Sequence, residues 1–496
     1  MEAKELTRGA GILMAITSLP SAYGIGTLGD AAFNFVDLLV DLKQRYWQIL
    51  PIGPISFGDS PYQSTSAFAG NPYLIDLDDL IRDDLLMESE VRSYNWGIDE
   101  RDVDYANLFE NRYQILKKAF ERFDTTKASF EKFAEDNSYW LEDYAVFMAI
   151  KTEKDNCEWI TWEKDIRNYK AEAVDAYKQK LHNQIDFWKF CQYKFFEQWS
   201  VLKQYANTRG IQIIGDIPLY MAMDSADVWA NRRLFQLGKN GELQQVAGSP
   251  PDNFTEDGQK WGNPVYDWDC MENESFDWWY HRMELNSRLF DVIRIDHFLG
   301  VVRYYTISVK ESNNKNGKWN KGPGKKLTDV IEQAVGGCKI IADSVGVQLA
   351  GAKKLMNRLG WPGIRILMFA FDGDTANENL PHNFEESNQV FYTGTHDNDT
   401  IVGYFRDKTE YELAYLYEYL NISSKEEIPD GFIRLAYSSI ADVVMIPMQD
   451  VLQLGNEARM NQPSTIGHNW RWRVGRETLS EERRAWIRTM ATVYRR

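Results

Sequence analysis

Runs of consecutive apolar residues, many of them β-branched, recur along the chain, and each is followed by polar or turn-forming residues. Eight such runs occur, at residues 11–18, 46–52, 211–220, 291–298, 339–344, 363–371, 389–397 and 442–450. Continuous apolar runs, rather than alternating ones, are typical of strands that are covered on both faces. The pattern therefore predicts eight buried strands.

Segments with helical periodicity lie between several of these runs. Two examples are "DAAFNFVDLLVDLKQ" at residues 30–44 and "FDWWYHRMELNSRLF" at residues 276–290. Alternation of strands and helices is typical of the α/β class, and eight strands favour a closed (β/α)8 TIM barrel.

Two long connections interrupt the alternation. Residues 81–207 are rich in Glu, Lys, Trp and Tyr at helical spacing, which predicts a helical insertion subdomain between the second and third strands. Residues 221–269 are rich in Gly, Pro, Asn and Asp, and we expect a loop-rich insertion there. The catalytic barrel is then predicted to comprise residues 1–80 and 208–496.

Five of the eight runs end in a carboxylate, alone or beside an amide. These residues are Asp216, Asp296, Asp343, Asp397 with Asn398, and Gln449 with Asp450. A single acidic residue after a strand is usually a turn residue or a helix cap. In a TIM barrel, however, the carboxyl ends of the strands form the active-site face. Five such ends indicate a polar site at the barrel mouth.

The segment "RIDHF" places Arg294 and Asp296 two residues apart on a strand, so both side chains point the same way. An adjacent guanidinium lowers a carboxyl pKa, which predicts an ionised Asp296 suited to nucleophilic attack on a sugar. A purely structural Arg–Asp pair is the alternative. His297 and His396 each adjoin a strand-end aspartate; a metal site there is disfavoured, because ligand spacing and a third His or Cys are missing.

Charge and composition narrow the classes of function. The chain has 496 residues and a formal net charge of −17, which disfavours nucleic acid and anionic membranes as partners. No apolar run is long enough for a membrane span or a signal peptide, so a cytoplasmic location is expected. The four cysteines are widely spaced, which favours free thiols. Aromatic residues make up 14%, a content that suits an ordinary core as well as stacking on sugar rings.

Long collinear segments resemble the 4-α-glucanotransferases of glycoside hydrolase family 77, the amylomaltases or disproportionating enzymes. They include "FGDSPYQSTSAFAGNPYLIDL", "GDIPLYMAMDSADVWAN", "GQKWGNP", "VIRIDHF", "THDN" and "EARMNQPSTIGHNW". The resemblance covers nearly the whole chain. It implies a TIM barrel that acts on maltooligosaccharides, amylose, or glucans derived from starch or glycogen, without a cofactor.

The resemblance also implies roles for individual residues. Asp296 is implied as the nucleophile and Asp397 as the group that stabilises the transition state. Arg294, His396 and Asp216 are implied to contact the donor sugar. A covering loop is implied to contribute Asp252, Gln259 and Trp261, and acceptor subsites are implied at Ser60, Tyr62 and Asn469. His297, beside the nucleophile, is a further candidate for binding sugar hydroxyls.

One departure from the family pattern falls on the general acid/base. The family has a glutamate followed by an aspartate after the fifth strand, whereas this chain has Asp343 and Ser344. The functional group is kept on a side chain that is one methylene shorter. Three outcomes stay open: a weakened acid/base at Asp343, a nearly inactive glucan-binding paralogue, or replacement by another carboxyl group. An amylase-like hydrolase with the same carboxylates is the enzymatic alternative.

Overall fold

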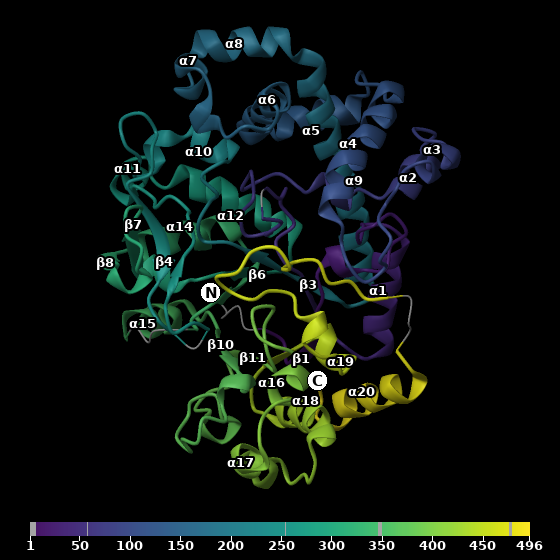
Figure 1. Ribbon diagram of the computed structural model, residues 1–496, viewed down its shortest axis with the longest axis vertical. Coiled ribbons are helices and arrows are strands. Elements are labelled where there is room, and N and C mark those ends of the chain that lie inside the picture. The colour runs from purple at the N-terminus through teal and green to yellow at the C-terminus, as the bar shows by residue number, and fades with distance from the viewer. Residues whose placement is uncertain (1–5, 57, 253, 346–349, 476–478) are drawn as a thin grey trace.

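In the computed structural model, residues 6–56, 58–252, 254–345, 350–475 and 479–496 are described, and an eight-stranded parallel sheet forms their centre (Figure 1). The strand order is β10-β11-β12-β1-β2-β3-β6-β9. The strands are β1 (Gly9–Leu13), β2 (Tyr46–Gln48), β3 (Gln212–Ile217), β6 (Val292–Ile295), β9 (Lys339–Ala342), β10 (Gly363–Ile366), β11 (Gln389–Tyr392) and β12 (Val443–Pro447).

Seven of the eight apolar runs contain one of these strands and the run at residues 11–18 overlaps β1, so the fold class is confirmed as a (β/α)8 TIM barrel. The strands are almost entirely buried, as expected for a sheet covered on both faces. The two ends of the sheet approach each other where the Ala342 amide donates to the Pro362 carbonyl at 2.9 Å. The barrel is thus nearly closed between β9 and β10.

Helices surround the barrel. Those between and after its strands are α1 (Asp30–Asp41), α12 (Asp277–Leu289), α13 (Leu299–Val302), α14 (Lys325–Val335), α15 (Ala350–Leu359), α16 (Ile401–Phe405), α17 (Glu410–Leu420), α18 (Ile428–Ser438), α19 (Met448–Val451) and α20 (Glu481–Val493). Within the described part of the chain, every helix is too short or too polar to traverse a lipid bilayer.

The long connection between β2 and β3 is helical. Its helices are α2 (Leu77–Arg82), α3 (Glu88–Arg92), α4 (Tyr105–Arg122), α5 (Ala128–Asp136), α6 (Ser138–Glu153), α7 (Lys164–Arg167), α8 (Ala171–Lys180) and α9 (His182–Thr208). The 27-residue α9 packs against α6 and also against α1 and β3 of the barrel. Large aromatic side chains such as Trp188 and Trp199 are buried along it. Burial of aromatic surface therefore fastens this connection to the barrel.

Residues 221–269, where a loop-rich insertion is predicted, contain short helices and strands between their loops. They include α10 (Ala226–Ala230), β4 (Gln245–Ser249), β5 (Gln259–Lys260) and α11 (Trp268–Asn273). Strands β4 and β5 pair with β7 (Arg303–Ser308) and β8 (Lys318–Lys321) in an antiparallel sheet of order β5-β4-β7-β8. Such short strands, containing Gly and Lys, carry too few apolar positions to show a period.

Candidate active site

A cavity of about 710 Å³ opens at the carboxyl ends of the barrel strands and collects most of the predicted site residues. Those that line it are Ser60, Tyr62, Asp252, Gln259, Trp261, Arg294, Asp296, His297, Asp343, His396 and Asp397. Asp216 and Asn469 do not line it. A cavity of this size accommodates an oligosaccharide segment rather than a single polar ion.

Arg294 is the central cation of the site. Its Nη1 donates to Asp216 Oδ2 at 2.5 Å and to Asp296 Oδ1 at 3.1 Å, and its Nη2 donates to Asp343 Oδ2 at 2.8 Å. Asp216 and Arg294 are register partners on the adjacent strands β3 and β6, so their side chains emerge on the same face. One guanidinium therefore holds three carboxylates from three neighbouring strands.

Asp216 lies behind the cavity wall. It is 1% exposed, and its Oδ2 accepts a hydrogen bond from the Tyr62 hydroxyl at 2.9 Å in addition to the one from Arg294. The Tyr62 ring in turn stacks on His396, with ring centroids 5.1 Å apart. Asp216 thus supports residues that face the cavity.

The expectation that Arg294 leaves Asp296 with a lowered pKa is wrong in direction. Removal from water raises the pKa of the Asp296 carboxyl well above its usual value, and nearby Asp216, Asp343 and Asp397 raise it further, against the opposing effect of Arg294. A single guanidinium shared by three carboxylates cannot offset burial and mutual repulsion together. The side chain nevertheless keeps 28% of its surface open, so a substrate in the cavity can reach it.

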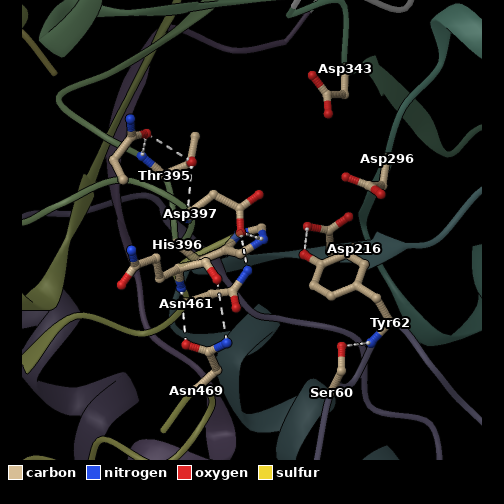
Figure 2. Close-up of polar contacts among 12 residues, drawn as sticks. Ser60, Tyr62, Asp216, Asp296, Asp343, Thr395, His396, Asp397, Asn461 and Asn469 are labelled. Atoms are coloured by element: carbon tan, nitrogen blue, oxygen red, sulfur yellow. Dashed lines mark hydrogen bonds and ion pairs between the residues drawn. The ribbon is translucent and has the colours of Figure 1, made fainter. Parts of the chain in front are cut away.

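Asp343 follows β9, and both of its carboxylate oxygens accept hydrogen bonds. Oδ2 accepts from Arg294 and, at 3.3 Å, from the backbone amide of His297, while Oδ1 accepts from the amide of Val345 at 3.2 Å. Figure 2 shows Asp343 next to Asp296, with Asp397 facing them from the other side of the site. The short side chain is held close to its own strand end.

The β11 end carries His396 and Asp397, and a distant segment supports it. Asn461 Nδ2 donates to Asp397 Oδ1 at 2.6 Å, and Arg459 Nη2 donates to the Asp397 carbonyl at 2.8 Å. His396 Nε2 lies 3.4 Å from the same Oδ1. Sequence reasoning did not single out Arg459 or Asn461; the only signal was their place in the matching segment "EARMNQPSTIGHNW".

Of the five strand ends predicted to converge on the barrel mouth, those of β3, β6, β9 and β11 do so and that of β12 does not. Asp450 is buried beneath the β11 end, where its Oδ2 accepts from the Thr393 hydroxyl at 3.0 Å and its Oδ1 from the Ile401 amide at 2.8 Å. Burial raises the pKa of Asp450 to about 7. Gln449 donates to the Ala458 carbonyl at 3.2 Å. Asp450 therefore braces the loop that carries Asp397, and Gln449 braces the segment that carries Arg459.

Residues of the predicted covering loop form one wall of the cavity. Trp261 Nε1 donates to Gln259 Oε1 at 3.0 Å, and the Trp261 ring meets His297 edge-on at 4.7 Å between ring centroids. Burial lowers the pKa of His297 to about 4, which keeps the ring neutral near pH 7. Asp252 accepts from the Ser249 hydroxyl and from backbone amides, so it shapes the loop.

Two residues predicted for the acceptor-sugar subsites, Ser60 and Asn469, form hydrogen bonds with nearby backbone groups. The Ser60 hydroxyl accepts from the Tyr62 amide at 3.2 Å. Asn469 Oδ1 accepts from the Gln462 amide at 3.1 Å, and its Nδ2 donates to the Thr465 carbonyl at 2.9 Å. The loop that Asn469 braces lines the cavity through other residues, namely Asn461, Pro463, Ser464, Thr465 and Ile466.

Comparison with known proteins agrees with this geometry. The family model for 4-alpha-glucanotransferase matches residues 14–478. A 4-alpha-glucanotransferase of Clostridium butyricum is 46% identical, over 97% of this chain and all of the relative, and one of Streptococcus pneumoniae is 43% identical over 99% and 97%. The solved amylomaltase of Streptococcus agalactiae in complex with acarbose is 40% identical, with a TM-score of 0.95 over 99% of both chains.

Proposed function

The chain belongs to glycoside hydrolase family 77 and is a 4-alpha-glucanotransferase, and from this premise we propose how its residues carry out the transfer. The observation that carries the proposal is that Arg294 holds Asp216, Asp296 and Asp343 together. Of these three, Asp296 and Asp343 line one cavity with Asp397. Its substrates are α-1,4-linked maltooligosaccharides and longer glucans of the same linkage. The chemistry is a retaining double displacement.

Asp296 is the nucleophile. Its free oxygen attacks the anomeric carbon of the donor, the bond from that carbon to the glycosidic oxygen breaks, and a glycosyl ester forms on the enzyme. The attack requires the ionised carboxylate. Because the pKa of Asp296 is raised, we expect the acid limb of the rate profile to lie above the usual range of an aspartate.

Asp397 stabilises the positive charge that develops on the donor ring. A negative group placed beforehand needs no reorganisation during the reaction. Asn461 and Arg459 hold the side chain and the backbone of Asp397, respectively. His396, at 3.4 Å from Asp397 and stacked on Tyr62, contacts the same sugar.

Asp343 is the general acid and base. It gives its proton to the departing 4-oxygen and then removes a proton from the 4-hydroxyl of the acceptor, which attacks the ester and releases Asp296. Its contacts oppose this role, since Oδ2 must give up Arg294 or His297 before it can reach a substrate oxygen. We therefore infer turnover slower than a glutamate at this position would allow.

The remaining candidates bind and enclose the glucan. Trp261 and Gln259 cover the donor side, where exclusion of water favours a sugar hydroxyl over hydrolysis. Tyr62 and neutral His297 present a ring surface and a ring nitrogen to sugar. Arg294 contacts the donor, Asp216 positions Arg294 and Tyr62, and Ser60, Asp252 and Asn469 shape the surrounding loops.

Incubation with maltotriose tests the proposal. Transfer yields glucose together with a ladder of longer oligosaccharides, which chromatography resolves. Shortening to glucose and maltose without any longer product would favour the amylase-like hydrolase. Unchanged maltotriose combined with measurable binding would leave only a glucan-binding protein and would contradict the proposed turnover.

A further inference from the structure

Part of the helical connection between β2 and β3 reaches the cavity, at a place where no predicted site residue lies. Glu158, Trp159 and Ile160, from the segment after α6, line the same cavity as Asp296. Met223 and Asp224, from the loop after β3, line it beside them. Figure 1 shows α6 and α7 on the opposite side of β6 from β10 and β11, so this wall is separate from the Asp397 side of the site.

A buried ion pair joins the two segments of this wall. Lys151 near the end of α6 donates from Nζ to Asp224 Oδ2 at 2.5 Å. The same ammonium donates to the carbonyls of Asn156 and Cys157, at 3.2 Å and 3.3 Å. The Lys151 side chain is 7% exposed and that of Asp224 is 18% exposed. We call this pair and its backbone contacts the Lys151–Asp224 clasp.

Trp159 completes the connection. Its amide donates to Asp224 Oδ1 at 3.1 Å, and its indole Nε1 donates to the Met223 carbonyl at 2.7 Å. The indole itself is fully buried. A buried ion pair stabilises a structure only when further hydrogen bonds satisfy its remaining atoms, and those bonds are present here. The clasp therefore fixes the orientation of Glu158 and Ile160, the residues on either side of Trp159.

The side chains of Glu158 and Ile160 carry groups that can bind a sugar. Glu158 is exposed and offers carboxylate oxygens that accept hydrogen bonds from hydroxyl groups, while half-buried Ile160 offers an apolar surface to a pyranose ring. Within the described residues, the Glu158 carboxylate accepts no hydrogen bond from a neighbouring group. An acceptor and an apolar surface side by side, in a cavity larger than one sugar ring needs, match a further unit of a glucan chain.

On the basis of the proposed function, we propose that Glu158 and Ile160 form an outer glucan subsite and that the Lys151–Asp224 clasp holds it in place. The helical connection then takes part in substrate selection as well as in folding. A donor long enough to reach the wall gains affinity from it, whereas maltotriose bound across the reacting bond does not. Lys151 and Asp224 are positioning residues, since they act through the Glu158–Ile160 segment.

Steady-state transfer with maltotriose and with maltoheptaose tests the subsite. In Glu158→Ala, loss of one hydrogen bond to substrate raises KM for maltoheptaose about fivefold and leaves KM for maltotriose and both kcat values unchanged. Lys151→Met gives the same pattern, and Lys151→Arg restores part of the affinity. Equal changes for the two donors, or no change in Glu158→Ala, would overturn the proposal.

A matched control separates the clasp from general stability. Lys194 is also almost buried and paired, with Asp83 and Glu197, but does not line the cavity. Lys194→Met lowers the melting temperature without changing the ratio of the two KM values. Calorimetric binding of maltoheptaose requires no turnover. Should the wild type prove inactive, the proposed function fails, whereas an equal Kd for wild type and Glu158→Ala would overturn the subsite itself.

Discussion

The ends of β11 and β9 both present an aspartate to the same cavity, but they hold it in different ways. At the β11 end, Asp397 accepts from the neutral amide of Asn461, and the loop around it is braced by Arg459 and Asp450. At the β9 end, Asp343 accepts from the guanidinium that also holds Asp216 and Asp296. The Asp397 carboxylate is held by a neutral amide, whereas the Asp343 carboxylate is paired with the Arg294 guanidinium.

This difference shows how much a catalytic role depends on side-chain length. A group that only stabilises charge can stay where its hydrogen bonds hold it, as Asp397 does. A proton carrier has to reach the leaving oxygen, and a misplacement of about 1 Å costs roughly 100-fold in rate. The missing methylene of Asp343 leaves its oxygens within reach of Arg294 and the His297 amide.

Asp296, at the end of β6, is the proposed nucleophile of the site. Asp296→Asn removes the attacking oxygen and keeps the size of the side chain, so we expect transfer from maltotriose to fall at least about 10³-fold. Asp257→Asn, a change at an exposed carboxylate, serves as control and keeps full activity. If Asp296→Asn keeps a tenth of the wild-type rate, the assignment of Asp296 is refuted.

The support of the β11 end is tested through Asp450. The pKa of Asp450 is higher in the folded protein than in the unfolded chain. The contribution of this group to the free energy of unfolding is therefore fully present below the pKa of the unfolded chain and is lost as pH rises through about 7. Asp450→Asn removes the titration. Between pH 4 and pH 8, the free energy of unfolding of this variant therefore falls by up to about 4 kcal/mol less than that of the wild type. Urea denaturation at several pH values measures this. Identical pH dependence in both proteins would contradict the burial of a titrating group.

Removal of the Asn461 amide makes the β11 end less ordered. Asn461→Ala loses the hydrogen bond to Asp397, and we expect kcat to fall about tenfold, with little effect on melting temperature. Asn469→Ala disturbs the same loop without touching Asp397, and we expect a change below about threefold. Equal losses would mean that the shape of the loop, rather than the contact to Asp397, accounts for the effect.

Much of the fold was readable because the barrel strands are buried on both faces. Within these runs, residues 340–342 and 443–448 are continuously apolar, and they mark β9 and β12 without any alignment. The antiparallel sheet was missed because β5 has two residues and β8 reads "KWNK", so neither shows a hydrophobic period. Tertiary pairing, rather than local sequence, makes these segments strands.

The site was predictable where chemistry follows a strand directly and obscure where it comes from far along the chain. Asp296 and Asp343 come directly after β6 and β9, and Arg294 lies two residues before Asp296. Asn461 is 64 residues from Asp397, and only the folded chain brings the two together. The burial of Asp296 beside other carboxylates, which raises its pKa despite Arg294, is likewise a property of the assembled barrel.

The most direct test of the central claim compares the transfer rate of the wild type with that of Asp343→Glu, using saturating maltotriose at pH 6 to 8. The longer side chain lets the carboxyl group reach the leaving oxygen, and we predict that kcat rises about 10- to 100-fold with the melting temperature almost unchanged. A folded Asp343→Glu protein with the same or a lower kcat would contradict the claim that position 343 limits this enzyme.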